Sequence, residues 1–321
     1  MFLKEVSLMY STEKVLKDFR DVPLKEREKA IGSELVEREM LSKLPPLMRN
    51  MFVDAFLNPA REEQIKTDER TIMLKIFFAQ LNISAVANHI ITHKPSSHKA
   101  LEALYNKSPV MFFDRYFYDC RAGDAIPDRL NAVVENVPHL IRKIGEEKAF
   151  IKVLIPGSGS AQDIIRILVN NPDIRHKTVV RCIDDELSAI KLGRKMAKKA
   201  GVSDNVVYVK DDLMRLDYQD TDLVLLVGII CPLPNIVSIK VVKKVVSYCR
   251  KGALVVFSAA LQKMLIEDPV TCFIMDIAGW RLNYKTKKEV EEIAKKSGLA
   301  PRGSFQDPKN KYHQIIIGEV I

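Results

Sequence analysis

The sequence from residue 150 to 163 is Phe-Ile-Lys-Val-Leu-Ile-Pro-Gly-Ser-Gly-Ser-Ala-Gln-Asp, and it decides how the second half of the chain folds. The apolar run Ile151–Ile155 is short, rich in branched side chains and followed by Pro156, which predicts a buried strand. A glycine turn comes next, and apolar residues at helical spacing over 164–169 then predict a helix. Strand, glycine turn and helix together bring backbone N–H groups and a helix N-terminus to a ligand at the edge of an α/β sheet.

The composition indicates a globular protein of two domains. The chain has 321 residues, of which 47% are hydrophobic and 28% charged, which excludes a disordered protein. A net charge of +9 favours anionic partners, including nucleic acid, but the lysines are spread along the chain, and a solvated basic surface is the alternative. The five cysteines have no paired spacing, no apolar run is long enough to span a bilayer, and the N-terminus lacks a signal-peptide pattern. We therefore expect reduced thiols and a cytoplasmic location.

Helical patterns fill the first half of the chain, from residue 1 to 148. They predict an all-helical domain with helices at about 5–20, 25–41, 46–57, 68–92 and 128–143, the last one kinked at Pro138. We expect this domain to cap and position a substrate for the domain that follows, or to serve as an interaction domain.

Two local patterns in this half have a functional and a structural interpretation. His89 and His93 are four residues apart on one helix face, but the glutamate of a zinc-protease motif and a further Cys/His cluster are missing, so we expect no metal site. Tyr116 and Tyr118 belong to an aromatic cluster just before the glycine turn. They could form a lid over a substrate or cofactor, or pack the helical bundle against the sheet, and both interpretations stay open.

From residue 149 to 321 the chain alternates between strands and helices. Strands are predicted at about 151–155, 178–183, 206–209, 223–230 and 253–258, then, after an irregular segment and a helix at 286–297, at 303–306 and 312–320. This alternation predicts a mostly parallel sheet with helices on both faces. A hairpin-like loop joins the final two strands, so the last strand is expected to be antiparallel to its neighbour.

Polar side chains at successive strand ends indicate which ligand the glycine turn serves. The dinucleotide fingerprint needs a third glycine where this chain has Gln162. Asp184 ends the second strand, where a carboxylate can accept hydrogen bonds from two ribose hydroxyls. Asp212 and Leu213 follow the third strand, where a carboxylate beside an apolar wall could bind the exocyclic amine of adenine. Because carboxyl ends of parallel strands meet at one edge, the pattern predicts an adenosine-type ligand there.

At these residues the chain resembles the class I S-adenosylmethionine-dependent methyltransferases, over about residues 150–321. The resemblance rests on Val-Leu-Ile-Pro-Gly-Ser-Gly-Ser-Ala (153–161), Cys-Ile-Asp-Asp-Glu-Leu-Ser (182–188), Val-Lys-Asp-Asp-Leu (209–213) and Lys-Lys-Ser-Gly-Leu-Ala-Pro (295–301). More loosely, Val227-Gly228-Ile229, Leu233-Pro234-Asn235 and Trp280-Arg281 are similar to bacterial methyltransferases of unassigned substrate. The resemblance implies an α/β fold with a seven-stranded Rossmann-like sheet in the order 3-2-1-4-5-7-6, strand 7 antiparallel, and S-adenosyl-L-methionine as cofactor.

The resemblance also implies where each part of the cofactor binds. It places the methionine part at Gly157 and Gly159, the ribose at Asp184, the adenine at Asp212 and Leu213, and the methyl-donor side at Gly228 and Ile229. The full set of expected cofactor-binding residues is Gly157, Ser158, Gly159, Ala161, Asp184, Asp185, Asp212, Leu213, Gly228 and Ile229.

Two positions depart from the family's pattern. Ile155 stands where the family usually has an acidic residue that orients the methionine amino group, and Ala161 stands at the third glycine. Either Asp163 replaces that acid, or the cofactor binds more weakly.

The expected function is methyl transfer by in-line displacement to a small-molecule or lipid-like acceptor, with no residue assigned as general base. The segment 230–235, Ile-Cys-Pro-Leu-Pro-Asn, lacks the polar-Pro-Pro-aromatic motif that grips an exocyclic base amine, and Cys231 is expected to pack beside the strand. Three alternatives stay open: a tRNA- or rRNA-modifying methyltransferase, an aminopropyl transferase of the nicotianamine-synthase type, and a non-catalytic relative that has kept the fold.

Overall fold

The computed structural model describes residues 21–57, 84, 86, 98–107, 114–216, 218–277 and 280–321. The chain forms two compact units. The helical unit comprises Met1–Pro127 and Leu261–Tyr284, and the sheet unit comprises Asp128–Ala260 and Lys285–Ile321. The sequence placed the boundary at 148/149; here it lies earlier, inside a helix, and a later segment of the chain also belongs to the helical unit.

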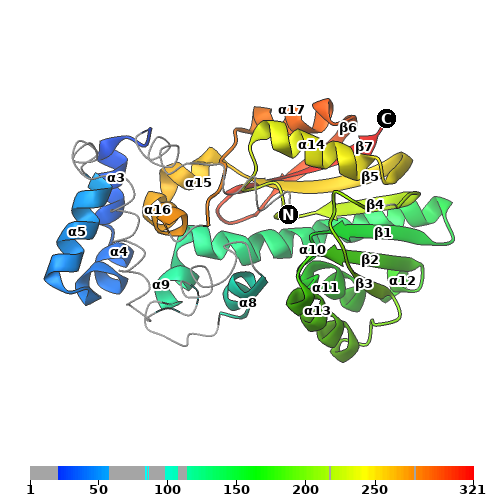
Figure 1. Ribbon diagram of the computed structural model, residues 1–321, viewed down its shortest axis with the longest axis horizontal. Coiled ribbons are helices and arrows are strands. Elements are labelled where there is room, and N and C mark those ends of the chain that lie inside the picture. Colours follow the sequence, from blue (N-terminus) through cyan, green and yellow to red (C-terminus); the bar gives the residue numbers. More distant parts are fainter. Residues whose placement is uncertain are drawn as a thin grey trace. The chain divides into compact units, whose positions relative to one another are not determined.

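The sheet unit is built on seven strands in the order β3-β2-β1-β4-β5-β7-β6 (Figure 1). The strands are β1 (Ile151–Pro156), β2 (Thr178–Asp184), β3 (Val206–Lys210), β4 (Thr221–Leu226), β5 (Cys249–Ala260), β6 (Leu299–Gln306) and β7 (His313–Val320). The β7 strand is antiparallel to both of its neighbours, and the other pairs are parallel. The predicted order and the antiparallel last strand are confirmed. Six strands therefore end at one edge of the sheet, the carboxyl edge.

Helices cover both faces of this sheet, as the alternating sequence predicts. The helices of the sheet unit are α10 (Arg121–Glu147), which begins in the helical unit, α11 (Gln162–Asn170), α12 (Pro172–Arg175), α13 (Leu187–Lys199), α14 (Asn235–Val246) and α17 (Lys287–Lys296). Figure 1 shows α11 and α13 on the opposite side of the sheet from α14 and α17. Buried side chains of α10, α11 and α13 share one core cluster with β1, β2, β3 and β4. Covered on both faces, β1 is apolar almost throughout, which is why it was recognisable in the sequence.

The α10 helix differs from its prediction because it is one continuous helix of 27 residues that includes Pro127 and Pro138. A proline inside a helix removes a backbone hydrogen bond and costs about 3 kcal/mol. Val133, Val137 and Ile141 are each 0% exposed in the core of the sheet unit. Burying such side chains contributes about 1.5–3 kcal/mol each, which is enough to hold the helix together across its prolines.

The helical unit consists of short helices. They are α3 (Leu24–Ile31), α4 (Glu34–Glu39), the 3-10 turn η1 (Leu41–Lys43), α5 (Pro46–Leu57), α8 (His98–Asn106), α9 (Asp114–Asp119), the start of α10, α15 (Gln262–Glu267) and α16 (Pro269–Ile277). The helix predicted at 46–57 has those bounds. The one predicted at 25–41 is broken at Gly32, and Ser33 caps the next helix by accepting a hydrogen bond from Val36 N. The helices predicted at 5–20 and 68–92 lie outside the described residues, apart from residues 84 and 86.

None of the described helices is long and apolar enough to span a membrane. All five cysteines are free thiols.

Candidate functional site

The glycine turn after β1 is a tight loop of left-handed residues. Gly157, Gly159 and Ala161 have φ values of +63°, +55° and +58°. Ser158 N donates to Ile183 O of β2 at 2.9 Å, and Ala161 N donates back to Ser158 O at 2.9 Å. Glycine adopts this conformation freely, whereas Ala161 does so at a cost of about 1–2 kcal/mol. Every second residue from Gly157 to Ala161 is therefore left-handed. Ala161 has the same backbone conformation as the two glycines before it.

Asp184, the last residue of β2, fixes this loop from the neighbouring strand. Its Oδ2 accepts a hydrogen bond from Gly159 N at 2.8 Å, and its Oδ1 accepts one from Glu186 N at 2.8 Å. Burial raises the pKa of Asp184, and the two N–H groups oppose that rise. Each carboxylate oxygen still has a second lone pair, so this group can shape the loop and also accept hydrogen bonds from a ligand.

The ends of β2 and β3 are joined by a hydrogen bond from Asp211 N to Asp184 O at 3.1 Å. Asp212 Oδ1 accepts from Met214 N at 2.9 Å, which closes a turn after β3. Leu213 is buried within that turn, and its carbonyl accepts the Tyr248 hydroxyl at 2.6 Å. The structure thus places Asp184, Asp212 and Leu213 at one edge, and the role of Asp212 at an adenine stays a prediction.

The end of β4 lies beside the glycine loop. The predicted strand at 223–230 stops at Leu226, because Gly228 has φ +85° and its N–H donates to Ser258 Oγ of β5 at 2.9 Å. Ile229 then packs on the glycine loop so closely that a Cβ on Gly157 would overlap its Cδ1 atom. Gly157 and Ile229 are therefore neighbours. The contact with Ser258 has no motif in the sequence and shows only in the fold.

Comparison with known proteins bears on the fold. No protein-family model and no curated protein matches the sequence. Among solved structures, a candidate exported protein of Bordetella parapertussis has a TM-score of 0.60 and 11% identity, over 98% of each chain. The SAH-bound magnesium protoporphyrin IX methyltransferase of Synechocystis PCC 6803 has a TM-score of 0.50 and 13% identity, over 68% of this chain and 92% of that one. A candidate O-methyltransferase of Nostoc punctiforme has a TM-score of 0.49 and 18% identity, over 60% of this chain and 57% of that one.

The sheet order and the match to the Synechocystis enzyme agree on one architecture. This chain has the class I methyltransferase fold. At these identities the likeness establishes the fold alone, so the chemistry has to be argued from the residues at the carboxyl edge.

The methyltransferase fold brings an arginine to this edge that the sequence did not indicate. Arg129 lies in α10 and is 6% exposed. A Cβ added to Gly228 would lie 3.4 Å from its Nη2 atom, so the guanidinium group sits beside the end of β4. A single arginine in an amphipathic helix gives no signal in a sequence; only its burial reveals it.

Three residues singled out in the sequence lie within cores. Ile155, at the family's acidic position, is 3% exposed within the core cluster of the sheet unit. Cys231 is buried, and its thiol donates to Ser258 O at 3.6 Å. Tyr116 is 1% exposed in the helical unit, with its hydroxyl 2.7 Å from Thr271 Oγ1.

Tyr118 is buried in the helical unit as well, and burial raises its pKa to about 12. Both tyrosines are therefore buried within the helical unit, while a lid role for them and packing of the bundle against the sheet stay predictions. His89 and His93 lie outside the described residues.

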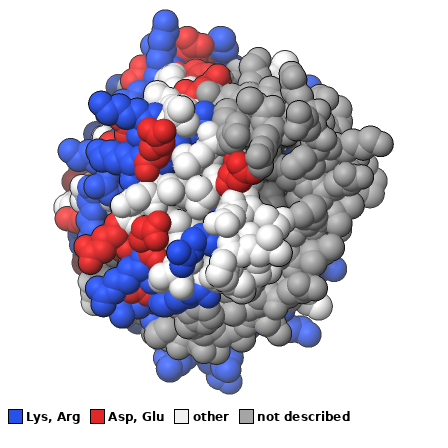
Figure 2. Space-filling model, turned by 90° about the vertical axis from the view of Figure 1, so that its left-hand side faces the viewer, with Lys and Arg blue, Asp and Glu red and all other residues white. Residues whose placement is uncertain are grey.

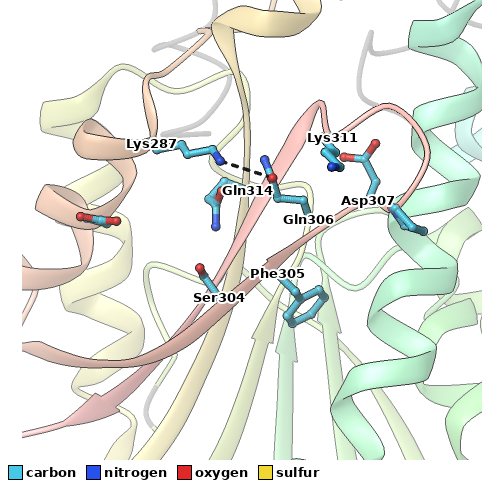
Figure 3. Close-up of a pocket in the computed structure, with 9 residues that line it drawn as sticks. Lys287, Ser304, Phe305, Gln306, Asp307, Lys311 and Gln314 are labelled. Carbon is cyan, nitrogen blue, oxygen red and sulfur yellow. Dashed lines mark hydrogen bonds between the residues drawn. The ribbon is translucent and has the colours of Figure 1, made fainter.

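An open pocket of about 350 Å³ lies beside the edge strand β6 (Figure 3). It is lined by Lys287, Glu291, Ser304, Phe305, Gln306, Asp307, Pro308, Lys311 and Gln314. Lys287 Nζ donates to Gln306 Oε1 at 3.4 Å across it. Strands β4, β5 and β7 lie between β6 and β1 in the sheet, and part of the pocket's lining comes from the loop that joins β6 to β7.

Proposed function

We propose that this protein is an S-adenosylmethionine-dependent methyltransferase that acts on a small-molecule or lipid-like acceptor. The observation that carries the proposal is the hydrogen bond from Gly159 to Asp184, which ties a left-handed glycine loop to a carboxylate at the next strand end, at the carboxyl edge of a methyltransferase fold.

The residues at this edge fit the cofactor from one end to the other. Asp212 and Leu213 would hold the adenine, the free lone pairs of Asp184 would accept the ribose hydroxyls, and the loop at Gly157 would lie against the methionine part. Gly228 and Ile229 complete the same edge from β4. When bound, S-adenosylmethionine supplies a methyl group on a positively charged sulfur.

The protein's contribution to such a reaction is mainly positioning. A bound cofactor would give its methyl group to the acceptor's oxygen, nitrogen or carbon, and the electron pair of the broken carbon–sulfur bond would stay on sulfur. The acceptor's proton must leave to a base, and we assign no residue to that step. Holding the acceptor in line with the methyl group supplies much of the rate, and we propose that the helical unit does so. The porphyrin named in the Synechocystis structure is an acceptor of the small-molecule class.

A nucleic-acid substrate is the weaker alternative. Backbone phosphates are bound by surfaces on which lysine and arginine gather without acidic neighbours. In Figure 2, blue basic and red acidic side chains are interspersed over the described part of the face shown. An aminopropyl transferase would use the same cofactor site, and the mass added to the product, a methyl or an aminocarboxypropyl group, separates the two reactions.

Replacing Asp184 with asparagine is expected to weaken the binding of S-adenosylmethionine and S-adenosylhomocysteine about tenfold. Asparagine has only one acceptor oxygen, so Gly159 N and Glu186 N can no longer both be bound, and the ribose loses a charged acceptor. Isothermal titration calorimetry measures the effect. Asp204→Asn, an exposed aspartate in the turn before β3, is the matched control and should bind as the wild type does. Absence of binding by the wild type would exclude the enzymatic proposals, whereas normal binding by Asp184→Asn would place the site elsewhere.

A further inference from the structure

Arg129 is a buried cation that lacks a hydrogen-bond or ion-pair partner among the described residues. Its side chain is 6% exposed, and its Nε atom is buried without a hydrogen bond. Within the part of the chain that the structure describes, neither a hydrogen bond nor an ion pair involves this guanidinium group. Burying an unpaired charge costs several kcal/mol. Proteins therefore retain such a charge where a bound ligand supplies the opposite charge.

The groups around Arg129 leave its charge available. His313 of β7 is close enough to interact electrostatically, but burial lowers the pKa of His313, so its imidazole is largely neutral at pH 7. One oxygen of the Asp307 carboxylate is engaged with His313: Asp307 Oδ1 accepts His313 N at 2.5 Å and lies 3.4 Å from Nδ1, whereas Oδ2 is buried without a hydrogen bond among the described residues. Asp128, next to Arg129 in α10, accepts Lys309 N at 2.9 Å.

Asp163 supplies the opposite charge at the same edge. It lies in the first turn of α11, directly after the glycine loop, and its Oδ1 accepts the backbone N–H of Ile164 at 2.8 Å. Burial raises the pKa of Asp163, and the positive charges of Arg129 and Arg166 oppose that rise. Arg166 donates its own hydrogen bonds to Gln162 Oε1 at 3.0 Å and to Asn131 Oδ1 at 3.5 Å. Asp163 and Arg129 therefore interact at a distance, and the described residues give neither an ion-pair partner.

A separated pair of opposite charges, with Arg129 buried and Asp163 partly buried, matches a ligand that carries both charges itself. We infer that Arg129 and Asp163 together bind a zwitterionic α-amino-acid group, with Arg129 taking the carboxylate and Asp163 the ammonium. Gly228 has no side chain, which leaves space beside the guanidinium for the carboxylate to approach. A phosphate or a simple dicarboxylate fits less well, because Asp163 would repel it.

This inference rests on the proposed function, in which the α-amino-acid group is the methionine end of S-adenosylmethionine. It accounts for the departure at Ile155. That residue is enclosed in the core, where a carboxylate would be desolvated, and the acid instead stands on the first turn of α11. A separate amino-acid substrate offers the same chemistry and is the other source of such a group.

The test compares ligands with and without the amino-acid group. S-adenosylhomocysteine and 5′-methylthioadenosine share adenosine and sulfur, and only the first carries the zwitterion. For Arg129→Gln and for Asp163→Asn we expect calorimetry to show S-adenosylhomocysteine binding about tenfold weaker, with 5′-methylthioadenosine binding within about twofold of the wild type. Asp163→Asn is the milder change and keeps the test informative if Arg129→Gln does not fold. Loss of affinity for both ligands in both variants would indicate a structural role and overturn the inference.

A second measurement tests whether the amino-acid group belongs to a separate amino-acid substrate. Wild-type protein saturated with S-adenosylhomocysteine is titrated with a mixture of the common L-amino acids. If S-adenosylhomocysteine binds equally well to both variants and the wild type alone binds an amino acid, the site serves a second substrate. If the affinities for S-adenosylhomocysteine and for amino acids are both unchanged in the Arg129 and Asp163 variants, the inference is wrong while the proposed function stands. If the wild type binds neither nucleoside, the proposed function itself fails.

Discussion

Replacing Gly157 with alanine is expected to weaken the binding of S-adenosylhomocysteine by roughly 100-fold. Alanine at φ +63° costs about 1–2 kcal/mol, and a Cβ at this position would overlap Ile229 Cδ1, which adds about 1–3 kcal/mol of overpacking. The loop or Ile229 must move to relieve that overlap. Either movement changes the edge at which the cofactor is proposed to bind, and calorimetry measures the resulting loss.

Two further variants separate the causes of this loss. Gly201 has φ +68° at the end of α13, and a Cβ there would meet nothing within 4 Å. Gly201→Ala therefore has the same backbone strain without the overlap, and should lower stability by about 1–2 kcal/mol with affinity unchanged. Adding Ile229→Ala to Gly157→Ala removes the overlapping atoms. The effects of the two substitutions on affinity should therefore be non-additive in a double-mutant cycle. Additive effects would show that Ile229 is not the obstacle.

The strands of the sheet unit could be predicted because their causes are local. Short branched runs, glycine turns and an aspartate at the end of β2 are visible in the residues themselves. The same is true of Thr286, whose capping box with Glu289 starts α17 one residue later, as the sequence pattern indicates. The glycine loop belongs with them, because its left-handed residues need particular residue types.

The features that could not be predicted from the sequence depend on contacts between residues far apart in the chain. The segment after β5 was expected to be irregular, yet it forms α15 and α16, where Phe273 packs edge-on against Phe52 and Phe56 at 5.9 and 5.4 Å between ring centroids. The end of β4 at Leu226 depends on the hydrogen bond to Ser258. Arg129 belongs to the same class, since its role can be inferred only from its burial beside Gly228 and its electrostatic interaction with Asp163. Local patterns thus identify the edge at which we propose that the cofactor binds, while tertiary packing supplies the charges that would recognise its amino-acid end.

Asp222→Asn is expected to lower the free energy of unfolding by about 2–3 kcal/mol at pH 7. Asp222 is 1% exposed at the start of β4, on the edge opposite the glycine loop. Its Oδ1 accepts Lys148 Nζ and Arg250 Nε, each at 2.5 Å, and its Oδ2 accepts Lys152 N at 2.8 Å. Asparagine would leave two cations facing each other without the buried anion, though both are about a third exposed, which limits the loss.

The matched control is the neighbouring exposed pair. Asp220 accepts Lys152 Nζ at 2.6 Å, with side chains 60% and 49% exposed. Asp220→Asn should change stability by less than about 0.5 kcal/mol, because surface ion pairs contribute little. Asparagine also tolerates the left-handed backbone of that residue, where φ is +64°. Urea denaturation followed by circular dichroism compares both variants with the wild type.

The pH dependence shows whether the charge of Asp222 is the cause. Burial alone would raise the pKa of Asp222, but the hydrogen bonds from Arg250, Lys148 and the Lys152 amide outweigh it and hold the pKa below its ordinary value. A carboxyl group with a lowered pKa in the folded state stabilises the protein above its unfolded pKa, near 3.9, and that stabilisation is lost as pH falls through the folded pKa. The difference between wild type and Asp222→Asn should therefore be constant from pH 7 to about 5 and shrink below about pH 4. A difference that persists undiminished at pH 3 would show that the amide destabilises the site by its shape and hydrogen bonding, and that the buried charge contributes nothing.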